Sequence, residues 1–475
     1  MVADDPAMAT AIAKLRGEWT AQTGSDLQVD QVAQRDLEGS ASVQADALVA
    51  PAYLLGPLAE RDLLAPVPKD LLDGPDWADL FDLLKLREAS WGSEAGQSIK
   101  AVPFGSPVFV CYYRADLLAK LNRRPPQSWE EYQELAKLLA AEKPPGRSDW
   151  CGTIEPLGPG WAGLVLLARA APYAKHRDSY STLFNIDSME PLLTTPAMAR
   201  ALEELVAAAK LGPTNPFAFD PTAARVAFWT GRCGMALSWP TASSQSGGRR
   251  AEGGGAFNRA PTGSETRKAE SGKRKAEGEA APPDVNLPAK IDPAIRVGFA
   301  ELPGSQKVYN LSTHAWDTRG DDEDQHVPLL SISGRLGMVS KASPHREAAF
   351  RLLFWLIDND RSWQVSTASP ATTLFRRSQE KSAERWVEKP AAPPAAAQYA
   401  ATTAATFRRE QWLSALPLPG RAEYLSALDE AVRAALAKQK SPAEALAQAQ
   451  AKWRAITNRL GVERQRAAYR HSLGW

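Results

Sequence analysis

The stretch AVPFGSPVFVCYYRADLLAKL, residues 101–121, decides the fold that the sequence predicts. It begins as an apolar strand, but Gly105, Ser106 and Pro107 interrupt this strand in its middle. Glycine adds backbone freedom, and proline fixes its own φ and removes one hydrogen-bond donor from the strand ladder. Regular pairing therefore stops at this point. A strand that leaves one sheet and enters another needs such a stop, so the pattern indicates a passage between two domains.

Length and composition agree with this interpretation. A chain of 475 residues exceeds what a single hydrophobic core usually fills, so at least two domains are expected. The 56 Lys and Arg balance the 55 Asp and Glu, which gives no electrostatic reason to expect nucleic acid or an anionic membrane as the partner. The three cysteines have neither metal-ligand spacing nor an even number, so we expect buried free thiols.

The rest of the chain predicts alternating strands and helices. Residues 1–100 alternate between the two, which is typical of a parallel sheet covered on both faces. Residues 242–290 contain almost no large apolar residue, and we expect a disordered insertion there. A Pro/Ala linker is expected at 389–398, followed by a long helical region. Capping boxes are predicted where Ser128 precedes Glu131 and where Ser441 precedes Glu444.

The sequence argues for binding rather than catalysis. It has no GxSxG elbow after a strand, no phosphate loop, no GxGxxG motif and no HExxH. The five histidines are scattered without ligand spacing, and the acidic run 320–326 lacks the alternating ligands and the fixed glycine of a calcium loop. We therefore expect no catalytic residues, no metal and no cofactor.

Six stretches together resemble the extracellular solute-binding proteins of ABC importers, in the branch that includes the maltose-binding proteins. The similarity covers nearly the whole chain, except for 242–290 and 311–327. The matching stretches are ADALVAPAYLLGPLAERDLLAPVP (45–68), VPFGSPVFVCYYRADLL (102–118), PPQSWEEYQELAKLL (125–139), AFWTGRCGMALSWP (227–240), GRLGMVSKASPHREAAFRLLFWL (334–356) and SPAEALAQAQAKWRAI (441–456). Their order and spacing carry the resemblance. One departure is the methionine of the fourth stretch, which stands one place earlier than in the family.

The resemblance implies an α/β protein with the two-lobed periplasmic-binding-protein fold, type II, in which each lobe is a mixed sheet flanked by helices. Lobe 1 would comprise residues 1–107 and 328–368, and lobe 2 residues 108–327 and 369–475, with the 242–290 insertion in lobe 2. Crossing strands would join the lobes, with Gly105 and Pro107 at the hinge. Rigid lobes can then close on a ligand while a few hinge residues absorb the change in backbone angles.

Ligands of open α/β sheets bind at the carboxyl ends of the strands, which makes Asp4, Asp5, Tyr53 and Trp239 candidates. Phe104 and Ser106 are candidates because they lie at the crossing itself. The resemblance adds Glu155 and Trp161, since the family's corresponding loop often carries an acid and an aromatic residue that contact sugar. Trp239 ends a short strand, and in sugar-binding relatives a tryptophan at the matching position stacks on a pyranose. Some candidates have structural alternatives: Asp4 and Asp5 can cap the following helix, and Tyr53 can pack in a core.

The function implied by the resemblance is capture of a small solute, a carbohydrate above all, for an ABC permease in the membrane. The protein would be a monomer located in the periplasm or anchored outside the cytoplasm. No signal peptide is visible, and the first strand is only a stub, so we expect the start to be truncated. Two alternatives stay open: a secreted carbohydrate-active enzyme, and a binding or scaffold protein that has lost transport. The sequence identifies neither the ligand nor a lipid anchor.

Overall fold

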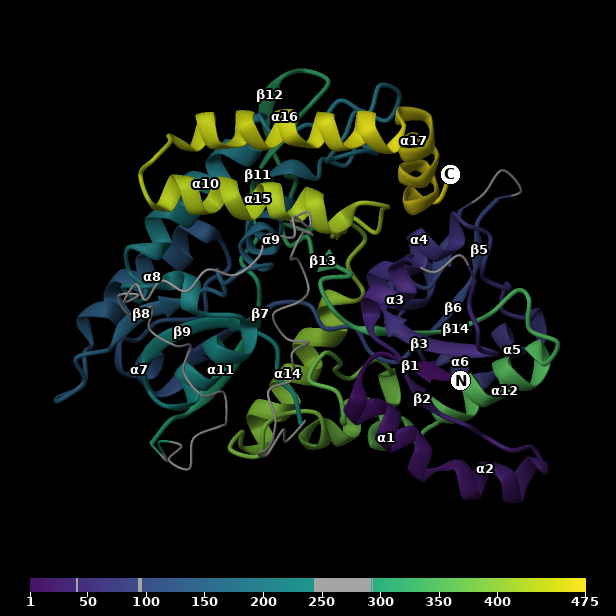
Figure 1. Ribbon diagram of the computed structural model, residues 1–475. Helices are drawn as coiled ribbons and strands as arrows, with labels where there is room; N and C mark the ends of the chain where they lie inside the picture. Colours follow the sequence, from purple (N-terminus) through teal and green to yellow (C-terminus); the bar gives the residue numbers. More distant parts are fainter. Residues whose placement is uncertain (40–41, 93–95, 243–291, 293) are drawn as a thin grey trace, which may run out of the picture.

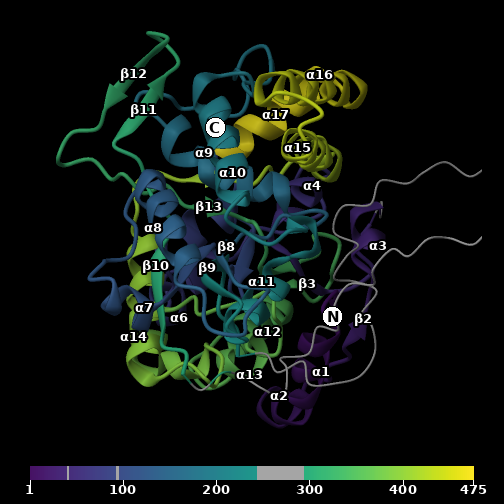
Figure 2. The same ribbon diagram turned by 90° about the vertical axis from the view of Figure 1, so that its left-hand side faces the viewer.

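The computed structural model describes residues 1–39, 42–92, 96–242, 292 and 294–475, and the fold is shown in Figures 1 and 2. The predicted insertion 242–290 lies, apart from residue 242, outside these residues. The strands are β1 (Val2–Ala3), β2 (Asp30–Gln31), β3 (Ala47–Pro51), β4 (Ser90–Trp91), β5 (Ser98–Ile99), β6 (Ala101–Pro103), β7 (Val110–Arg114), β8 (Cys151–Ile154), β9 (Cys233–Ser238), β10 (Val297–Glu301), β11 (Lys307–Asn310), β12 (Ala315–Thr318), β13 (Leu329–Leu330), β14 (Arg335–Val339) and β15 (Leu413–Ser414).

Helices surround these strands. They are α1 (Pro6–Lys14), α2 (Arg16–Thr23), α3 (Gln34–Gly39), α4 (Leu55–Ala59), α5 (Lys69–Leu72), α6 (Pro75–Ala78), α7 (Ala115–Lys120), α8 (Trp129–Ala141), α9 (Ala162–Ala174), α10 (Pro196–Ala209), α11 (Pro221–Trp229), α12 (Arg346–Leu356), α13 (Ser362–Ser366), α14 (Pro393–Thr406), α15 (Arg421–Leu436), α16 (Pro442–Leu460) and α17 (Val462–Leu473). Four shorter helical turns are η1 (Ala52–Leu54), the π-helical η2 (Leu84–Glu88), η3 (Pro216–Ala218) and η4 (Arg377–Arg385).

The strands near the N-terminus form a mixed sheet, called here the first sheet. Its strand order is β2-β1-β3-β14-β6, with β1 parallel to β2 and β3 and with β14 antiparallel to β3 and β6. Every residue of β3 and β14 is buried, as expected of central strands covered on both faces. Helices α1 and α12 pack on this sheet. The first sheet occupies the right-hand half of Figure 1.

A separate mixed sheet, called here the second sheet, has the strand order β10-β7-β9-β8. Strand β7 is antiparallel to both of its neighbours, whereas β8 and β9 run parallel. All residues of β7 and β9 are buried, and helices α8, α11 and α14 pack on the sheet. The second sheet lies on the left in Figure 1, away from the first. The alternation of apolar strands and amphipathic helices thus builds two cores.

The interrupted strand at the start of the stretch 101–121 does connect the two sheets. Strand β6 belongs to the first sheet and β7 to the second, so the interruption lies between them. Gly105 has φ +106°, and a Cβ at this position would lie 2.4 Å from the backbone oxygen of Thr373. Only glycine fits this crossing without strain.

A substitution tests this requirement. Gly105→Ala is expected to lower the free energy of unfolding by about 1–3 kcal/mol, because the new methyl group both strains the backbone and meets the Thr373 carbonyl. Chemical denaturation measures the change. Gly146→Ala is the matched control, since Gly146 has φ +76° but open space around its Cβ position. An equal loss in both variants would show that the close approach to Thr373 is unimportant.

The C-terminal part of the chain corrects one expectation. The predicted linker at 389–398 is wrong in its second half, because α14 begins there at Pro393. Proline at the first helical position lacks only an N–H that would be unpaired anyway, so it starts the helix instead of preventing it. The capping box of Ser441 and Glu444 is confirmed. At Ser128 only half of the box forms, because Glu131 accepts its hydrogen bond from the Gln127 N–H.

Helix α17 brings the end of the chain back to the first sheet's side of the molecule (Figure 1). It follows α16, which packs on α15, and α15 packs on α9. At its last turn His471 Nδ1 lies 2.6 Å from Glu60 Oε1, and the His471 carbonyl accepts a hydrogen bond from the Gly92 N–H (3.1 Å). Among the described residues, no helix is both long and apolar enough to cross a bilayer.

Candidate functional site

A buried ionic group lies where β1 ends. Asp4 and Asp5 directly follow β1, and Arg335 is the first residue of β14. The Arg335 guanidinium lies 2.8 Å from Asp4 Oδ1 and 3.9 Å from Asp5 Oδ2, and none of the three side chains is more than 8% exposed. Burial raises the pKa of Asp4, and the opposing charge of Arg335 limits the rise. The group therefore offers charged hydrogen-bonding atoms in a site shielded from water.

Asp5 has the structural role that the sequence left open. Its Oδ1 accepts hydrogen bonds from the N–H groups of Ala7 (3.0 Å) and Met8 (3.1 Å), which caps helix α1. Its other oxygen, Oδ2, accepts a hydrogen bond from the Ser369 hydroxyl at 2.5 Å. Asp5 thus joins the end of the first sheet to the segment that contains Ser369. A role towards a ligand stays a prediction.

Tyr53 lies in η1, immediately after β3, as expected for a residue at a strand's carboxyl end. The guanidinium of Arg421 lies 4.1 Å from the centre of its ring. The Tyr53 hydroxyl is buried and has no hydrogen-bond partner among the residues that the structure describes. Burial raises the pKa of Tyr53 and lowers that of Arg421 to about 10. An unpaired buried hydroxyl is costly, and a ligand contact for Tyr53 stays a prediction.

Three aromatic rings meet at the end of β9. Trp239 lies 5.8 Å from Phe109 and 5.6 Å from Trp161 between ring centres, and Phe109 lies 6.2 Å from Trp161. We call these residues the aromatic group. Trp239 is 4% exposed, and its indole N–H donates to the Pro370 carbonyl at 3.0 Å. The group includes two predicted site residues, and its rings are tilted to one another by 46° to 71°.

The ionic and the aromatic groups share a segment of chain. Ser369 bonds Asp5 of the first sheet, and the next residue, Pro370, bonds Trp239 of the second. Two residues thus link the strand ends of the two sheets. The structure therefore connects Asp5 to Trp239, which are far apart in the sequence, through two consecutive residues.

A buried carboxyl group lies at the end of η2. Glu88 Oε1 accepts hydrogen bonds from the Ser331 N–H and hydroxyl, both at 2.9 Å. Ser106 is 2% exposed, and its hydroxyl lowers the pKa of the nearby Glu88 carboxyl. Burial of Glu88 has the larger effect and raises this pKa to about 7. A Cβ on Gly334 would lie 2.0 Å from the Ser106 oxygen, so the residue before β14 is in close contact with the crossing segment.

Two other predicted residues have strong structural contacts. Phe104 is fully buried, and its ring lies 2.6 Å from where a Cβ of Gly337 would be. Glu155 follows β8, but its Oε1 accepts a hydrogen bond from Arg169 Nη2 at 2.6 Å, and both side chains are buried. These contacts give both residues a role in the cores of the two sheets. Their predicted contact with a ligand remains a prediction.

Sequence reasoning missed three residues of this region: Arg335, Arg421 and Phe109. Arg335 did carry a signal, because a charged residue opens the otherwise apolar strand RLGMV. Phe109 lies inside the stretch 101–121, where its apolar neighbours indicate only another core residue. Arg421 has no local signal, since the packing of α15 alone brings it to Tyr53.

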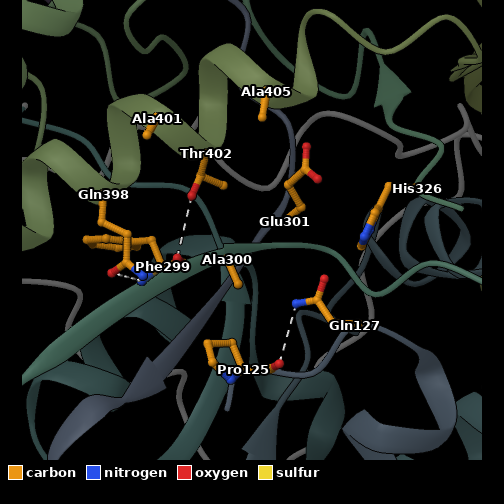
Figure 3. Close-up of a pocket in the computed structure, with 10 residues that line it drawn as sticks. All are labelled: Pro125, Gln127, Phe299, Ala300, Glu301, His326, Gln398, Ala401, Thr402 and Ala405. Carbon is orange, nitrogen blue, oxygen red and sulfur yellow. Dashed lines mark hydrogen bonds between the residues drawn. The ribbon is translucent and has the colours of Figure 1, made fainter. Parts of the chain in front are cut away.

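A separate hollow of about 330 Å³ lies beside the edge strand β10, as Figure 3 shows. None of the predicted site residues lines it. Its acid, Glu301, already bonds Arg409 and the Thr406 hydroxyl, and His326 Nδ1 lies 2.8 Å from the Leu302 carbonyl oxygen. The polar groups of this hollow are thus occupied within the protein.

Two mixed sheets, each with its own helices and joined by crossing segments, define the two-lobed periplasmic-binding-protein fold. Solved structures agree with it. A solute-binding protein of an ABC transporter from Agrobacterium radiobacter K84, in complex with ribitol, is 17% identical with a TM-score of 0.61, over 96% of this chain and 97% of that one. The maltose-bound MalE3 of T. maritima is 17% identical with a TM-score of 0.62, over 96% and 99%. An ABC transporter solute-binding protein from Agrobacterium vitis S4 with bound D-mannitol is 17% identical with a TM-score of 0.59, over 97% and 98%.

The sequence itself establishes the family. The family model described as bacterial extracellular solute-binding protein matches residues 6–360, so the chain belongs to that family. It is a family of extracellular binding proteins rather than of enzymes. No curated protein sequence matches the chain significantly.

Proposed function

We propose that this protein is the substrate-binding component of an ABC importer and that it captures a small carbohydrate between its lobes by hinge closure. The single observation that carries the proposal is the link that Ser369 and Pro370 make between Asp5, which lies beside Arg335, and Trp239 of the aromatic group. The ribitol, maltose and D-mannitol of the structural neighbours support a polyhydroxylated ligand.

The lobes of this proposal follow the two sheets. Lobe 1 comprises residues 1–107 and 328–368, and lobe 2 comprises residues 108–327 and 369–475, with the hinge at Gly105 and Pro107. The site residues are nearly all buried, so a ligand enters only when the lobes separate. Contacts with the ligand then favour the closed arrangement, since a ligand shifts a conformational equilibrium by its difference in affinity for the two states.

Each side chain has a chemical role in this site. The indole of Trp239 would stack on the apolar face of a sugar ring. Asp4 would accept hydrogen bonds from hydroxyl groups of the ligand, and Arg335 would donate to them. The unpaired hydroxyl of Tyr53 would gain a hydrogen-bond partner on the ligand. The protein would act as a monomer outside the cytoplasm, in the periplasm or anchored to the membrane, and would present its ligand to a permease.

A thermal-shift screen against monosaccharides, oligosaccharides and polyols tests the function. A ligand at about 100 times its Kd stabilises the folded state by about 2.7 kcal/mol, which gives a clear rise in melting temperature. Trp239→Ala is expected to weaken binding about tenfold or more, so the rise should shrink or vanish. Trp363→Ala is the control, because Trp363 is an exposed tryptophan outside the site.

Two outcomes contradict parts of the proposal. An undiminished rise with Trp239→Ala would mean that the stacking role is wrong, even though a ligand binds. If no carbohydrate or polyol stabilises the wild-type protein, the ligand class is wrong. Since Trp239→Ala can also lower the stability of the free protein, each rise is measured relative to the same variant without ligand.

A further inference from the structure

We propose that a second binding site, for a single neutral pyranose unit, lies on the protein surface between α10 and the β11–β12 hairpin. A hollow of about 460 Å³ occurs there, lined by Pro196, Ala199, Arg200, Glu203, Lys307 and Trp316. The hairpin is a two-stranded sheet apart from both main sheets, and it projects from the molecule in Figure 2. Both α10 and the hairpin belong to the proposed lobe 2, so hinge motion between the lobes leaves this hollow unchanged.

Trp316 forms one wall and is held in a fixed position although it is 37% exposed. Its direct cross-strand partner, Tyr309, lies 5.6 Å away between ring centres, and Tyr173 of α9 approaches at 6.2 Å with its ring nearly perpendicular. Contacts of this kind are usually made by buried rings. A rigid indole that still shows part of its surface to water loses little conformational entropy when a ligand stacks on it.

Arg200 supports the indole and is already neutralised. Its guanidinium lies 5.5 Å from the centre of the Trp316 ring and 4.6 Å from that of Tyr173. It pairs with Glu204 at 3.0 Å and also with Glu130. Arg200 therefore positions the indole and is a poor candidate for binding an anion.

Glu203 and Lys307 line opposite sides of the hollow, on α10 and β11. Glu203 is exposed and forms no ion pair among the described residues, and the Lys307 ammonium donates to the Thr318 hydroxyl at 2.5 Å. Arg200 and Lys307 stand against Glu203, Glu204 and Glu130, so the net charge here is only −1, which favours a neutral ligand over an anion. A carboxylate that accepts and an ammonium that donates suit vicinal hydroxyl groups beside an aromatic wall. These features together match a pyranose.

The test uses protein labelled with 5-fluorotryptophan, which gives a separate ¹⁹F resonance for each indole. The Trp316 resonance is assigned with Trp316→Phe. Titration with methyl α-D-glucopyranoside to millimolar concentrations is expected to shift this resonance along a saturating curve. Sorbitol, which has no ring face, should shift it much less. The matched control is the Trp363 resonance, since Trp363 is 38% exposed with Arg385 over its ring but lines no described hollow.

Two variants make the outcome decisive. Glu203→Ala should raise the dissociation constant at Trp316 about threefold or more, because one hydrogen-bond acceptor is lost. Trp239→Ala should leave the Trp316 curve unchanged, which separates this site from the one between the lobes. No saturating shift at Trp316, or equal shifts at Trp316 and Trp363, would overturn the proposal. Loss of the Trp316 shift in Trp239→Ala would overturn it too, and would assign the signal to the cleft.

Discussion

Replacing Arg169 with methionine is expected to lower the free energy of unfolding by about 3–5 kcal/mol, the largest effect predicted for this protein. Arg169 is completely buried, and its Nη2 lies 2.6 Å from Glu155 Oε1. Its guanidinium also lies 3.8 Å from the centre of the Trp129 ring. Methionine fills a similar space, but it leaves the Glu155 carboxylate buried without its cation. Urea denaturation measures the loss.

The double variant Arg169→Met with Glu155→Gln provides the control. It removes both charges, and it should recover most of the lost stability, because an uncompensated buried charge is the main cost. If the double variant is as unstable as the single one, the loss comes from packing around Trp129 instead. Arg454→Met is a second control: its exposed partner is Glu190, and we expect little change.

The second large effect concerns Glu88 and pH. Burial raises the pKa of Glu88 from 4.5 to about 7, so the folded protein holds more protons than the unfolded chain between these values. The contribution of Glu88 to stability is therefore greatest below about pH 4.5 and is lost as the pH rises to about 7. The contribution lost is about 3 kcal/mol. In Glu88→Gln this contribution is independent of pH, since the amide oxygen can still accept the hydrogen bonds from Ser331.

Denaturation curves at several pH values compare the wild-type protein with this variant. The difference in unfolding free energy should grow in favour of Glu88→Gln as the pH rises through the window. Glu190→Gln is the control, because Arg454 lowers the pKa of Glu190 and its titration falls below the window. Parallel pH profiles for the wild-type protein and Glu88→Gln would mean that Glu88 is not perturbed in the folded state.

The two-sheet architecture could be predicted because its signals are local. The stop at Gly105 and Pro107 separates β6 from β7, and the buried faces of the long helices follow their apolar spacing. The bounds of β2 could not be predicted as well, since the apolar alternation of residues 27–33 suggests a longer strand and only Asp30 and Gln31 pair with the sheet. Both are exposed edge residues, and an edge strand needs little apolar character.

The candidate site could be predicted only in part. Residues at strand ends, such as Asp4, Tyr53 and Trp239, follow from the rule that ligands bind at the carboxyl ends of strands. Their charged partners do not, because Arg335 and Arg421 reach them through tertiary packing across more than half of the chain. The same holds for Glu155, whose ion pair with Arg169 depends on how α9 packs.

The position of β14 between β3 and β6 has a consequence for biosynthesis. As the chain leaves the ribosome, all four strands of the second sheet have been made by Glu301. The first sheet still lacks its inner strand at that point, because β14 ends only at Val339. β6 has no partner in its sheet until then, since it pairs only with β14. The first sheet begins first along the chain but is therefore completed after the second, and β6 stays without a strand partner while residues 104–334 are made.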